Sequence, residues 1–293
     1  MNDKPQSAPV LLLGILTLIW GTSFILIKQG LKVFSADEVG SLRVASASLF
    51  LLPVAIVKLK EVKRSDYWKL FTSGMLGIFI PAFLYATAQT RMESSVAGIL
   101  NTITPLFTMI IGAIIFKQRF GVNAIAGILL GLVGTIVLSL FRTGSDITFN
   151  AFALFIVLAC FFYGSNSNFI KFKIPNVGAL TITSVSLMLI GPLAFTYLFG
   201  FTDFVEKLQT HDGSWKAFGF IALLGLMSTA VATILFNQLV KISTPLFASS
   251  VTYLLPIVGV MWGLLDGEKL HVFHFVGMAA IIGGVYIANR KKT

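Results

Sequence analysis

The 293-residue sequence predicts an all-α integral membrane protein in which ten transmembrane helices form two inverted five-helix repeats. Three observations lead to this prediction: an apolar composition, ten apolar segments of bilayer-spanning length, and a short motif that returns in the second half of the chain. Hydrophobic residues make up 56% of the chain and charged residues 12%, with a mean hydropathy of +0.89. Water-soluble domains carry about 25% charged residues, so this composition is typical of a membrane-embedded protein.

Ten apolar segments can be placed along the chain, each close to the roughly 20 residues that a helix needs to cross a bilayer. We number them as spans one to ten, and they cover residues 10–30, 38–57, 69–90, 94–116, 122–141, 151–171, 178–200, 217–240, 245–265 and 272–289. The segments end where charges and turn-forming residues cluster, as in KLKEVKRSD, RTGSD and LDGEK. The loops between them leave no room for a separate soluble domain of even about 50 residues.

Span one is expected to remain in the mature protein. Its apolar run is longer than that of a signal peptide and is followed by Lys28 and Lys32 without a small-residue cleavage site. Cys160 is the one cysteine of the chain, so no disulfide can form within it. The sequence also has no cluster of Cys and His with metal-ligand spacing, and we predict no metal site and no cofactor.

The lysines and arginines are unevenly distributed between the two ends of the predicted helices. When the loops are assigned alternately to two sides, fourteen Lys and Arg residues fall on the side of the N-terminus and seven on the other. Since basic residues mark the cytoplasmic side, both termini are expected in the cytoplasm. The basic residues are scattered at helix ends and form no patch, so the net charge of +10 predicts no nucleic-acid partner.

A motif of span one returns in span six. WGTS at residues 20–23 corresponds to YGSN at residues 163–166, at a shift of 143 residues. At a shift of 151 residues, Pro105 of span four corresponds to Pro256 of span nine. Spans one to five therefore repeat as spans six to ten.

The repeat predicts two five-helix units, residues 1–146 and residues 147–293, that form one membrane-embedded body. Because five is an odd number of spans, the second unit must enter the membrane from the opposite face. Inverted repeats are typical of transporters, in which the substrate site lies near the bilayer midplane between the two repeats. Duplicated channels use the same arrangement, so the repeat favours a transporter without excluding a channel.

Polar and aromatic residues in the middle of the spans predict a substrate cavity, because polar groups at membrane depth normally face the bundle interior. The predicted substrate-binding residues, all in such positions, are Trp20, Ser23, Tyr85, Gln89, Asn101, Thr104, Tyr163, Asn166, Asn237, Ser250 and Tyr253. They would give a pocket with aromatic walls and a few amide and hydroxyl groups, suited to a small, partly apolar solute. The alternative is that the Ser, Thr and Asn side chains only hydrogen-bond neighbouring helices, at about 0.6 kcal/mol each.

Arg43 lies several residues inside span two. It could meet a substrate carboxylate, but an ion pair with Asp37 or Glu38, or snorkelling toward the interface, is the favoured interpretation. Pro105 and Pro256 are candidates for paired bend points that allow gating, with a static kink as an equal alternative.

Spans five and ten both carry stripes of Gly and Ala, which allow two helix backbones to approach closely. We expect these two spans to pack together in a monomer, and a dimer contact is the less favoured use of the stripes.

Several stretches are the motifs of a known family: IWGTSF in span one, SLRVASASLFLLP in span two, the proline-containing spans four and nine, and Glu268 after span nine. Through these motifs, and over nearly its whole length, the chain resembles the EamA-type transporters of the drug/metabolite transporter superfamily. The resemblance implies a bacterial inner-membrane carrier for small metabolites, often amino acids. It also implies a central cavity lined mainly by spans one, three, four, six, eight and nine. The chain departs from the family at Lys117 and Gln118, where an acidic residue is expected after span four.

The leading functional prediction is a multi-pass transporter that works by alternating access, as an exporter or a facilitator. Its predicted cargo is small metabolites, above all amino acids, including aromatic or other apolar ones. No Asp, Glu or His lies in the middle of a span, which favours transport without obligatory proton coupling. Glu38, Glu93 or His274 near the span ends leave a proton-coupled drug/metabolite antiporter as the alternative.

A channel or a membrane-embedded enzyme is less well supported by the sequence. The polar face of the spans holds bulky aromatic residues and not a ring of one charge or of carbonyls, which disfavours a channel. The span interiors also supply almost none of the acids, bases and nucleophiles of an enzyme. We therefore predict no catalytic residue, and we expect a small-molecule substrate and the lipid bilayer as the partners of the chain.

Overall fold

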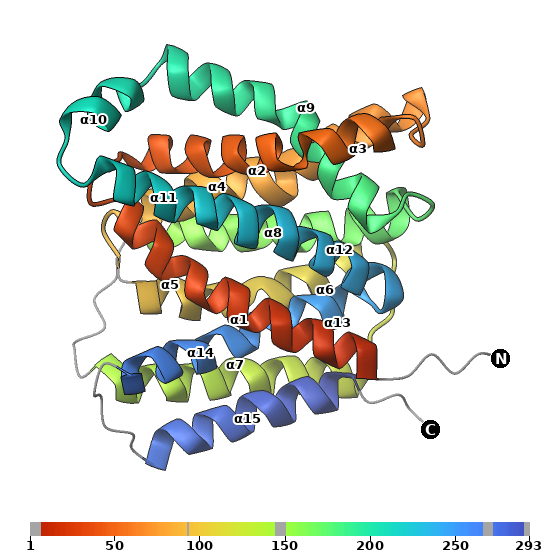
Figure 1. The fold of residues 1–293 in the computed structure, drawn as a ribbon. Helices are drawn as coiled ribbons and strands as arrows, with labels where there is room; N and C mark the ends of the chain where they lie inside the picture. Colours follow the sequence, from red (N-terminus) through yellow and green to blue (C-terminus); the bar gives the residue numbers. More distant parts are fainter. Residues whose placement is uncertain (1–6, 93, 144–150, 266–271, 290–293) are drawn as a thin grey trace.

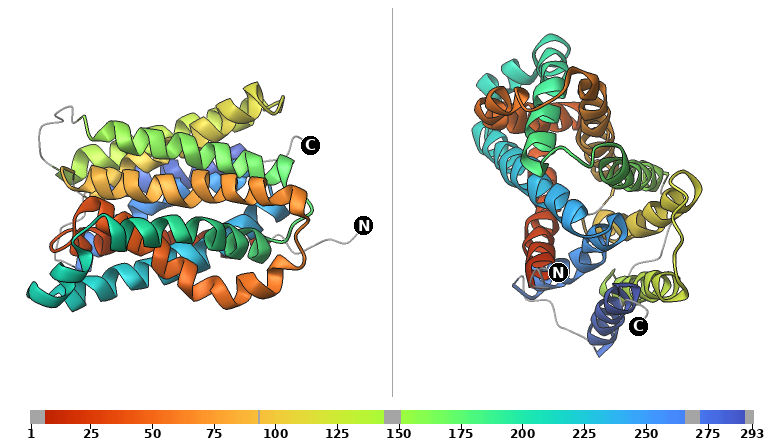
Figure 2. Two further views of the ribbon diagram at one scale, coloured as in Figure 1. Left: turned by 90° about the horizontal axis from the view of Figure 1, so that it is seen from above. Right: turned by 90° about the vertical axis from the view of Figure 1, so that its right-hand side faces the viewer.

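The computed structural model describes residues 7–92, 94–143, 151–265 and 272–289, and all regular secondary structure in this part of the chain is helical. The helices lie side by side in one bundle, with α7 and α15 as a pair at its edge (Figures 1 and 2). Glu93 and Glu268 lie outside the described residues, as does the side chain of His274.

The first half of the chain forms α1 (Ser7–Gly30), α2 (Ala36–Leu59), η1 (Arg64–Asp66), α3 (Tyr67–Gly74), η2 (Met75–Phe79), α4 (Ile80–Gln89), α5 (Ser94–Leu100), η3 (Asn101–Ile103), α6 (Thr104–Ile114) and α7 (Val122–Thr143). The second half forms α8 (Ala153–Lys173), α9 (Ala179–Gly200), α10 (Phe204–Thr210), α11 (Ser214–Leu224), η4 (Gly225–Val231), α12 (Ala232–Ile242), α13 (Pro245–Ser249), α14 (Val251–Leu265) and α15 (Val272–Asn289). Helices begin and end within about one turn of the ten predicted ranges.

Seven helical segments of the described chain are long and apolar enough to cross a membrane: residues 8–30, 36–59, 64–89, 96–114, 153–173, 179–200 and 214–242. Three shorter apolar helices lie at residues 122–137, 245–258 and 275–288. The chain is thus a multi-pass membrane protein, and an apolar helix lies at each of the ten predicted ranges, of spanning length in seven of them.

The distribution of side chains is the inverse of that in a water-soluble protein. Large apolar side chains point outward, such as Val57 at 66% exposure and Ile114 at 70%, whereas Asn168 and Thr183 are fully buried. The bilayer core offers no water, so polar groups must find partners inside the protein while lipid solvates the apolar exterior. Buried Ser, Thr and Asn residues therefore collect in the interior of the bundle.

The pair of α7 and α15 is held by close contact between glycines. A Cβ atom added at Gly284 would lie 2.6 Å from the carbonyl oxygen of Gly127, and one added at Gly134 would lie 2.9 Å from that of Gly277. Only residues without a Cβ atom allow the two backbones to approach so closely. The first turn of α1 and the last turn of α15 lie at the same end of the bundle (Figure 1).

Four of the membrane segments are interrupted at corresponding places. η2 and η4 are π-helical turns within spans three and eight, and a shift of 151 residues places residues 75–79 on residues 226–230, inside η4. Span four contains the 3₁₀ turn η3, and span nine is divided between α13 and α14. Turns of π-helix are rare and frequently occur at functional sites.

The two candidate bend points follow the interruptions of spans four and nine. Pro105 is the second residue of α6, directly after η3, and Pro256 lies inside α14, a few residues after that helix begins. Their role in gating stays a prediction.

Candidate substrate-binding cavity

A cavity lies in the interior of the bundle, between helices of both halves of the chain. Its lining residues, contributed by α1, α2, η2, α4, η3, α6, α8, η4, α12, α13 and α14, are Trp20, Ser23, Phe24, Ile27, Arg43, Gly77, Tyr85, Asn101, Thr104, Tyr163, Asn166, Ser228, Thr233, Phe236, Asn237, Ser249, Thr252 and Leu255. About 70 Å³ is available to the centres of water-sized molecules, so the cavity holds several waters or one small solute. The lining spans are the six that the family resemblance implies, together with span two.

Eight of the eleven predicted substrate-binding residues line this cavity. They are Trp20, Ser23, Tyr85, Asn101, Thr104, Tyr163, Asn166 and Asn237. The structure thus brings together side chains from spans one, three, four, six and eight that are far apart in the sequence.

The other three predicted residues do not line the cavity. Gln89 accepts a hydrogen bond from the hydroxyl of Ser94 at 3.1 Å, and the hydroxyl of Ser250 donates back to its own helix at Phe247 O, at 2.6 Å. Tyr253 points toward α7, where its hydroxyl donates to the carbonyl of Ile128 at 3.0 Å. Tyr253 therefore fastens α14 to the α7–α15 pair, a role that side-chain type and span position alone did not distinguish from cavity lining.

The span-one motif rests on the π-helical turn of span eight. The indole Nε1–H of Trp20 donates to the carbonyl oxygen of Ser228 at 3.0 Å, and the hydroxyls of Ser23 and Ser228 are hydrogen-bonded at 2.8 Å. Ser228 belongs to η4. Two polar side chains of this apolar helix, Trp20 and Ser23, thus have a specific partner on span eight. The hydroxyl of Thr22 instead donates to its own helix at Leu18 O, at 2.9 Å.

The span-six motif rests in the same way on the π-helical turn of span three. The carboxamide of Asn166 covers Gly77 of η2 so closely that a Cβ atom at Gly77 would overlap it. The Oδ1 atom of Asn166 accepts a hydrogen bond from Ser73 at 2.8 Å. Ser23 and Asn166 are counterparts in the repeated motif, and so are Gly77 and Ser228 at the shift of 151 residues.

Span four reaches the cavity at its 3₁₀ turn. Pro105 has no N–H to donate to the carbonyl of Asn101 four residues earlier, and the hydroxyl of Thr104 donates to this carbonyl instead, at 2.7 Å. The carbonyl oxygen of Asn101 therefore still accepts a hydrogen bond. Asn101 and Thr104 both line the cavity at this turn.

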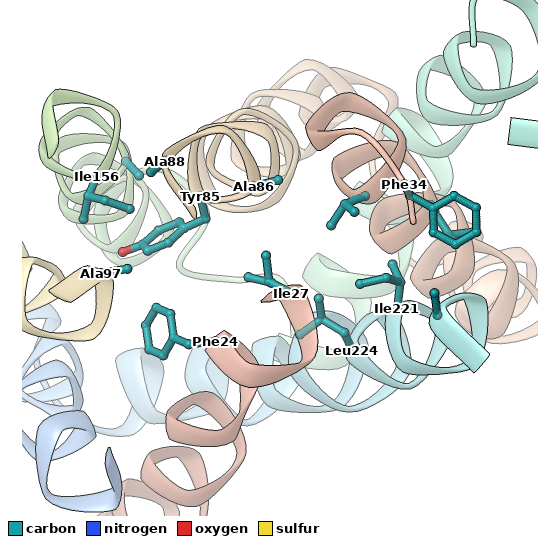
Figure 3. Close-up of a cluster of buried hydrophobic side chains, with 14 of the residues drawn as sticks. Phe24, Ile27, Phe34, Tyr85, Ala86, Ala88, Ala97, Ile156, Ile221 and Leu224 are labelled. Atoms are coloured by element: carbon teal, nitrogen blue, oxygen red, sulfur yellow. The ribbon is translucent and has the colours of Figure 1, made fainter. Parts of the chain in front are cut away.

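Aromatic rings form much of the remaining wall. The ring centroids of Trp20 and Phe236 are 5.2 Å apart, and those of Tyr85 and Tyr163 are 6.0 Å apart. Figure 3 shows Phe24 of α1 and the ring of Tyr85 on α4 beside one another within the buried apolar cluster that continues from this wall. These rings offer flat apolar surfaces to a bound solute.

Arg43 reaches the cavity, contrary to the favoured prediction that it pairs with an acid or snorkels. Its Nε–H donates to the hydroxyl of Thr229 at 2.6 Å, and its Nη2 lies 3.5 Å from the hydroxyl oxygen of Ser228. The two acids expected as partners are engaged elsewhere: Glu38 with Lys207 at 2.8 Å and Asp37 with Tyr197 at 3.4 Å.

Two polar atoms of the cavity residues have no nitrogen or oxygen partner within the described part of the chain. They are the hydroxyl oxygen of Tyr85, which lies beside the thiol of Cys160, and the Oδ1 atom of Asn237. The Nδ2 atom of Asn237 donates to Thr183 at 2.9 Å, which fixes which side of its amide remains unused. Unsatisfied buried polar groups are costly, and in a native structure they often belong to a functional site.

Several cavity residues were not among the predicted ones. Gly77, Ser228, Thr233, Ser249 and Thr252 are small residues of spans whose facing depends on the π-helical turns and helix breaks. A regular helical period of 3.6 residues does not predict π-helical turns or helix breaks. The direction of these five side chains could therefore not be derived from the sequence. The shift of 151 residues, which relates Gly77 to Ser228, is the signal that could have found two of them.

A model of the EamA-like transporter family matches the chain twice, over residues 8–140 and residues 150–290. An uncharacterized transporter of Archaeoglobus fulgidus is 25% identical over 283 residues, which cover 96% of this chain and 99% of the relative. A probable amino-acid metabolite efflux pump of Salmonella typhimurium is 27% identical over 290 residues, covering 93% of this chain and 92% of the pump.

An uncharacterized inner membrane transporter of Escherichia coli is 23% identical, with 94% of this chain and 89% of the relative covered. A solved crystal structure matches with a TM-score of 0.74 and 17% identity, over 97% of each chain. At this identity the structural match shows the fold alone.

Proposed function

Because the chain belongs to the EamA-like transporter family, we propose that it is a carrier that moves small metabolites through the central cavity by alternating access. The observation that carries this proposal is the cavity itself, whose aromatic and polar wall is contributed by both halves of the chain. Transporters built from two repeats hold their substrate at such an interface and rock the repeats around it.

The carrier consists of two inverted five-helix repeats, residues 1–146 and 147–293. This arrangement of repeats is supported by two matching contacts between the halves of the chain. Gly21 of the first motif packs on Val258 of span nine, and its counterpart Gly164 packs on Phe107 and Thr108 of span four. Phe107 and Val258 are themselves related by the shift of 151 residues. Each motif helix thus packs on the corresponding helix of the other repeat, as a two-fold relation requires.

The protein resides in the bacterial inner membrane with both termini in the cytoplasm. The excess of Lys and Arg on the side of the termini supports this orientation. It acts as a monomer in which α7 and α15 remain packed together, supported by the close glycine contacts between these helices.

Amino acids are the proposed cargo class, with aromatic and other apolar ones foremost, and the carrier works as an exporter or facilitator. The amides and hydroxyls of the cavity offer hydrogen bonds to a small polar head, and the rings offer a surface for an apolar side chain. The relative described as a probable amino-acid metabolite efflux pump supports the same class.

Transport proceeds down the gradient of the solute without obligatory proton coupling. None of the described residues that line the cavity is Asp, Glu or His, and proton relays at membrane depth usually use such groups. Uphill accumulation of solute in liposomes driven by a pH gradient alone would instead favour the proton-coupled antiporter.

The test of the proposed site is amino-acid counterflow in liposomes that contain the purified full chain. Trp20→Ala, Asn101→Ala and Tyr163→Ala should each lower the exchange rate by about ten-fold or more, since each removes wall surface or hydrogen bonds in the cavity. Trp68→Ala is the matched control, because Trp68 is 59% exposed on the outside of α3. Normal kinetics in all three cavity variants would contradict the site, and an ohmic current in place of saturable exchange would indicate a channel.

A further inference from the structure

The cavity contains a cation with no carboxylate partner among the residues that the structure describes. Arg43 is the one charged side chain among the described residues that line the cavity. Within the described part of the chain, no Asp or Glu oxygen lies within 4.0 Å of its guanidinium. Glu38 and Asp37, the acids nearest in sequence, are engaged with Lys207 and Tyr197.

The guanidinium also has unused hydrogen-bonding capacity. Of its five N–H groups, the Nε–H is taken by Thr229 at 2.6 Å and one at Nη2 faces Ser228 at 3.5 Å. The remaining N–H groups have no acceptor among the described residues. The two hydroxyls hold the guanidinium at the cavity wall from one side, and the rest of its donors stay available to a solute.

A cation in such a place needs an anion. A charge withdrawn from water is costly unless it is paired, and the planar guanidinium fits a carboxylate through two parallel N–H···O hydrogen bonds. On the premise that the protein is a carrier with this cavity as its substrate site, we propose that Arg43 binds the carboxylate of the cargo and limits transport to small molecules that carry one.

The other walls of the cavity are suited to the rest of such a molecule. Trp20 with Phe236, and Tyr85 with Tyr163, present aromatic surfaces to an apolar side group. Asn237 also lines the cavity, and its Oδ1 is buried with no partner among the described residues. A small shift of this side chain would present the oxygen as an acceptor to an ammonium group, which an amino acid has and a simple carboxylic acid lacks. Amino acids and simple carboxylic acids both carry a carboxylate that could bind Arg43. The amino acid would also use the polar wall of the cavity through its ammonium group.

The experiment compares three probes of one shape in liposomes with the full chain: L-phenylalanine, its amide, which has no carboxylate, and 3-phenylpropionate, which has no ammonium. We expect exchange of phenylalanine at least ~10-fold faster than of its amide, with 3-phenylpropionate in between. Arg43→Gln should abolish the preference for carboxylates, and Arg43→Lys should keep part of it, because a charge remains but the fork is lost. Lys28→Gln is the matched control, since Lys28 is exposed at the end of α1.

The outcomes separate this inference from the proposed function. Exchange of the amide as fast as of phenylalanine, or an unchanged acid preference in Arg43→Gln, would overturn the role of Arg43 and leave the carrier standing. Fast exchange of 3-phenylpropionate alone would keep the role of Arg43 and move the cargo from amino acids to monocarboxylic acids. No saturable exchange of any of a wider set of amino acids and organic acids would overturn the carrier and this inference with it. If Arg43→Gln fails to fold, the comparison of acid and amide in the unaltered protein still decides the question.

Discussion

Gly77 has a packing role that depends on its having no side chain. It lies in the π-helical turn η2, on the cavity wall, directly beneath the carboxamide of Asn166. Asn166 in turn is held by Ser73, so it cannot swing freely away from an added atom. The missing side chain of Gly77 thus leaves the space that the amide of Asn166 on α8 occupies.

Gly77→Ala should therefore impair both stability and transport. The new Cβ atom would overlap the Asn166 amide, and overpacking of this kind costs about 1–3 kcal/mol. In Gly219→Ala the same change is made in span eight at a position where the added atom meets nothing within 4 Å. Thermal unfolding in detergent and counterflow should both be reduced in the first variant and near normal in the second, and equal behaviour of the two would argue against this packing.

At the residue scale, side-chain type and helical spacing predicted eight of the residues that line the cavity, but not the place of Arg43 among them. Trp20, Tyr163 and Asn166 could be placed because a repeated motif marked them and because bulky polar groups avoid lipid. The partner of Arg43 could not be derived, since the two acids nearby in sequence are engaged by Lys207 and Tyr197, which lie far along the chain.

The helices that cover the predicted spans are those with long apolar runs between charged loops, a pattern that fixes their limits through bilayer thickness. The interruptions of these helices were harder to predict from the sequence. Pro105 and Pro256 marked two of them, whereas the π-helical turns η2 and η4 contain no proline, although Pro81 follows η2 at the start of α4. A regular helical period therefore predicted where these two helices run, but not where they depart from α-helical geometry.

The end of α12 is fastened to α8 by a lysine. Lys171 Nζ donates to the carbonyl oxygens of Val240, Lys241 and Ser243, at 3.1, 2.9 and 2.5 Å. Lys241 returns the contact to Ile174 and Pro175, at 3.3 and 2.7 Å. A cation at the C-terminus of a helix is favourable both for its carbonyls and for the helix dipole.

Lys171→Met should loosen the ends of these two helices. The substitution removes a charged donor from three carbonyls and should lower the free energy of unfolding by about 2 kcal/mol. The apolar part of the side chain is kept. Lys173→Met, two residues on and exposed, is the matched control. The thermal midpoint of the purified protein should fall in Lys171→Met only, and an equal midpoint in both variants would mean that the contact adds no stability.

At the scale of the whole molecule, the two halves of the chain interlock around one cavity. The WGTS helix packs on spans eight and nine, and the YGSN helix packs on spans three and four. This exchange explains why the motif occurs twice: each copy provides cavity residues and, through its glycine, a close contact with the other half. If the halves rock against each other, the contacts around Gly21 and Gly164 are where the movement must be absorbed.

The most direct test of alternating access uses a single reporter cysteine in the cavity. Thr233→Cys places the thiol on the cavity wall, in a background in which the buried Cys160 is replaced by alanine. A membrane-impermeant thiol reagent should modify it from either side of the membrane, and a transported solute should protect it. Leu158→Cys, on the outside of α8, should not react. Modification from one side only, unchanged by solute, would contradict a carrier that opens the cavity to each side in turn.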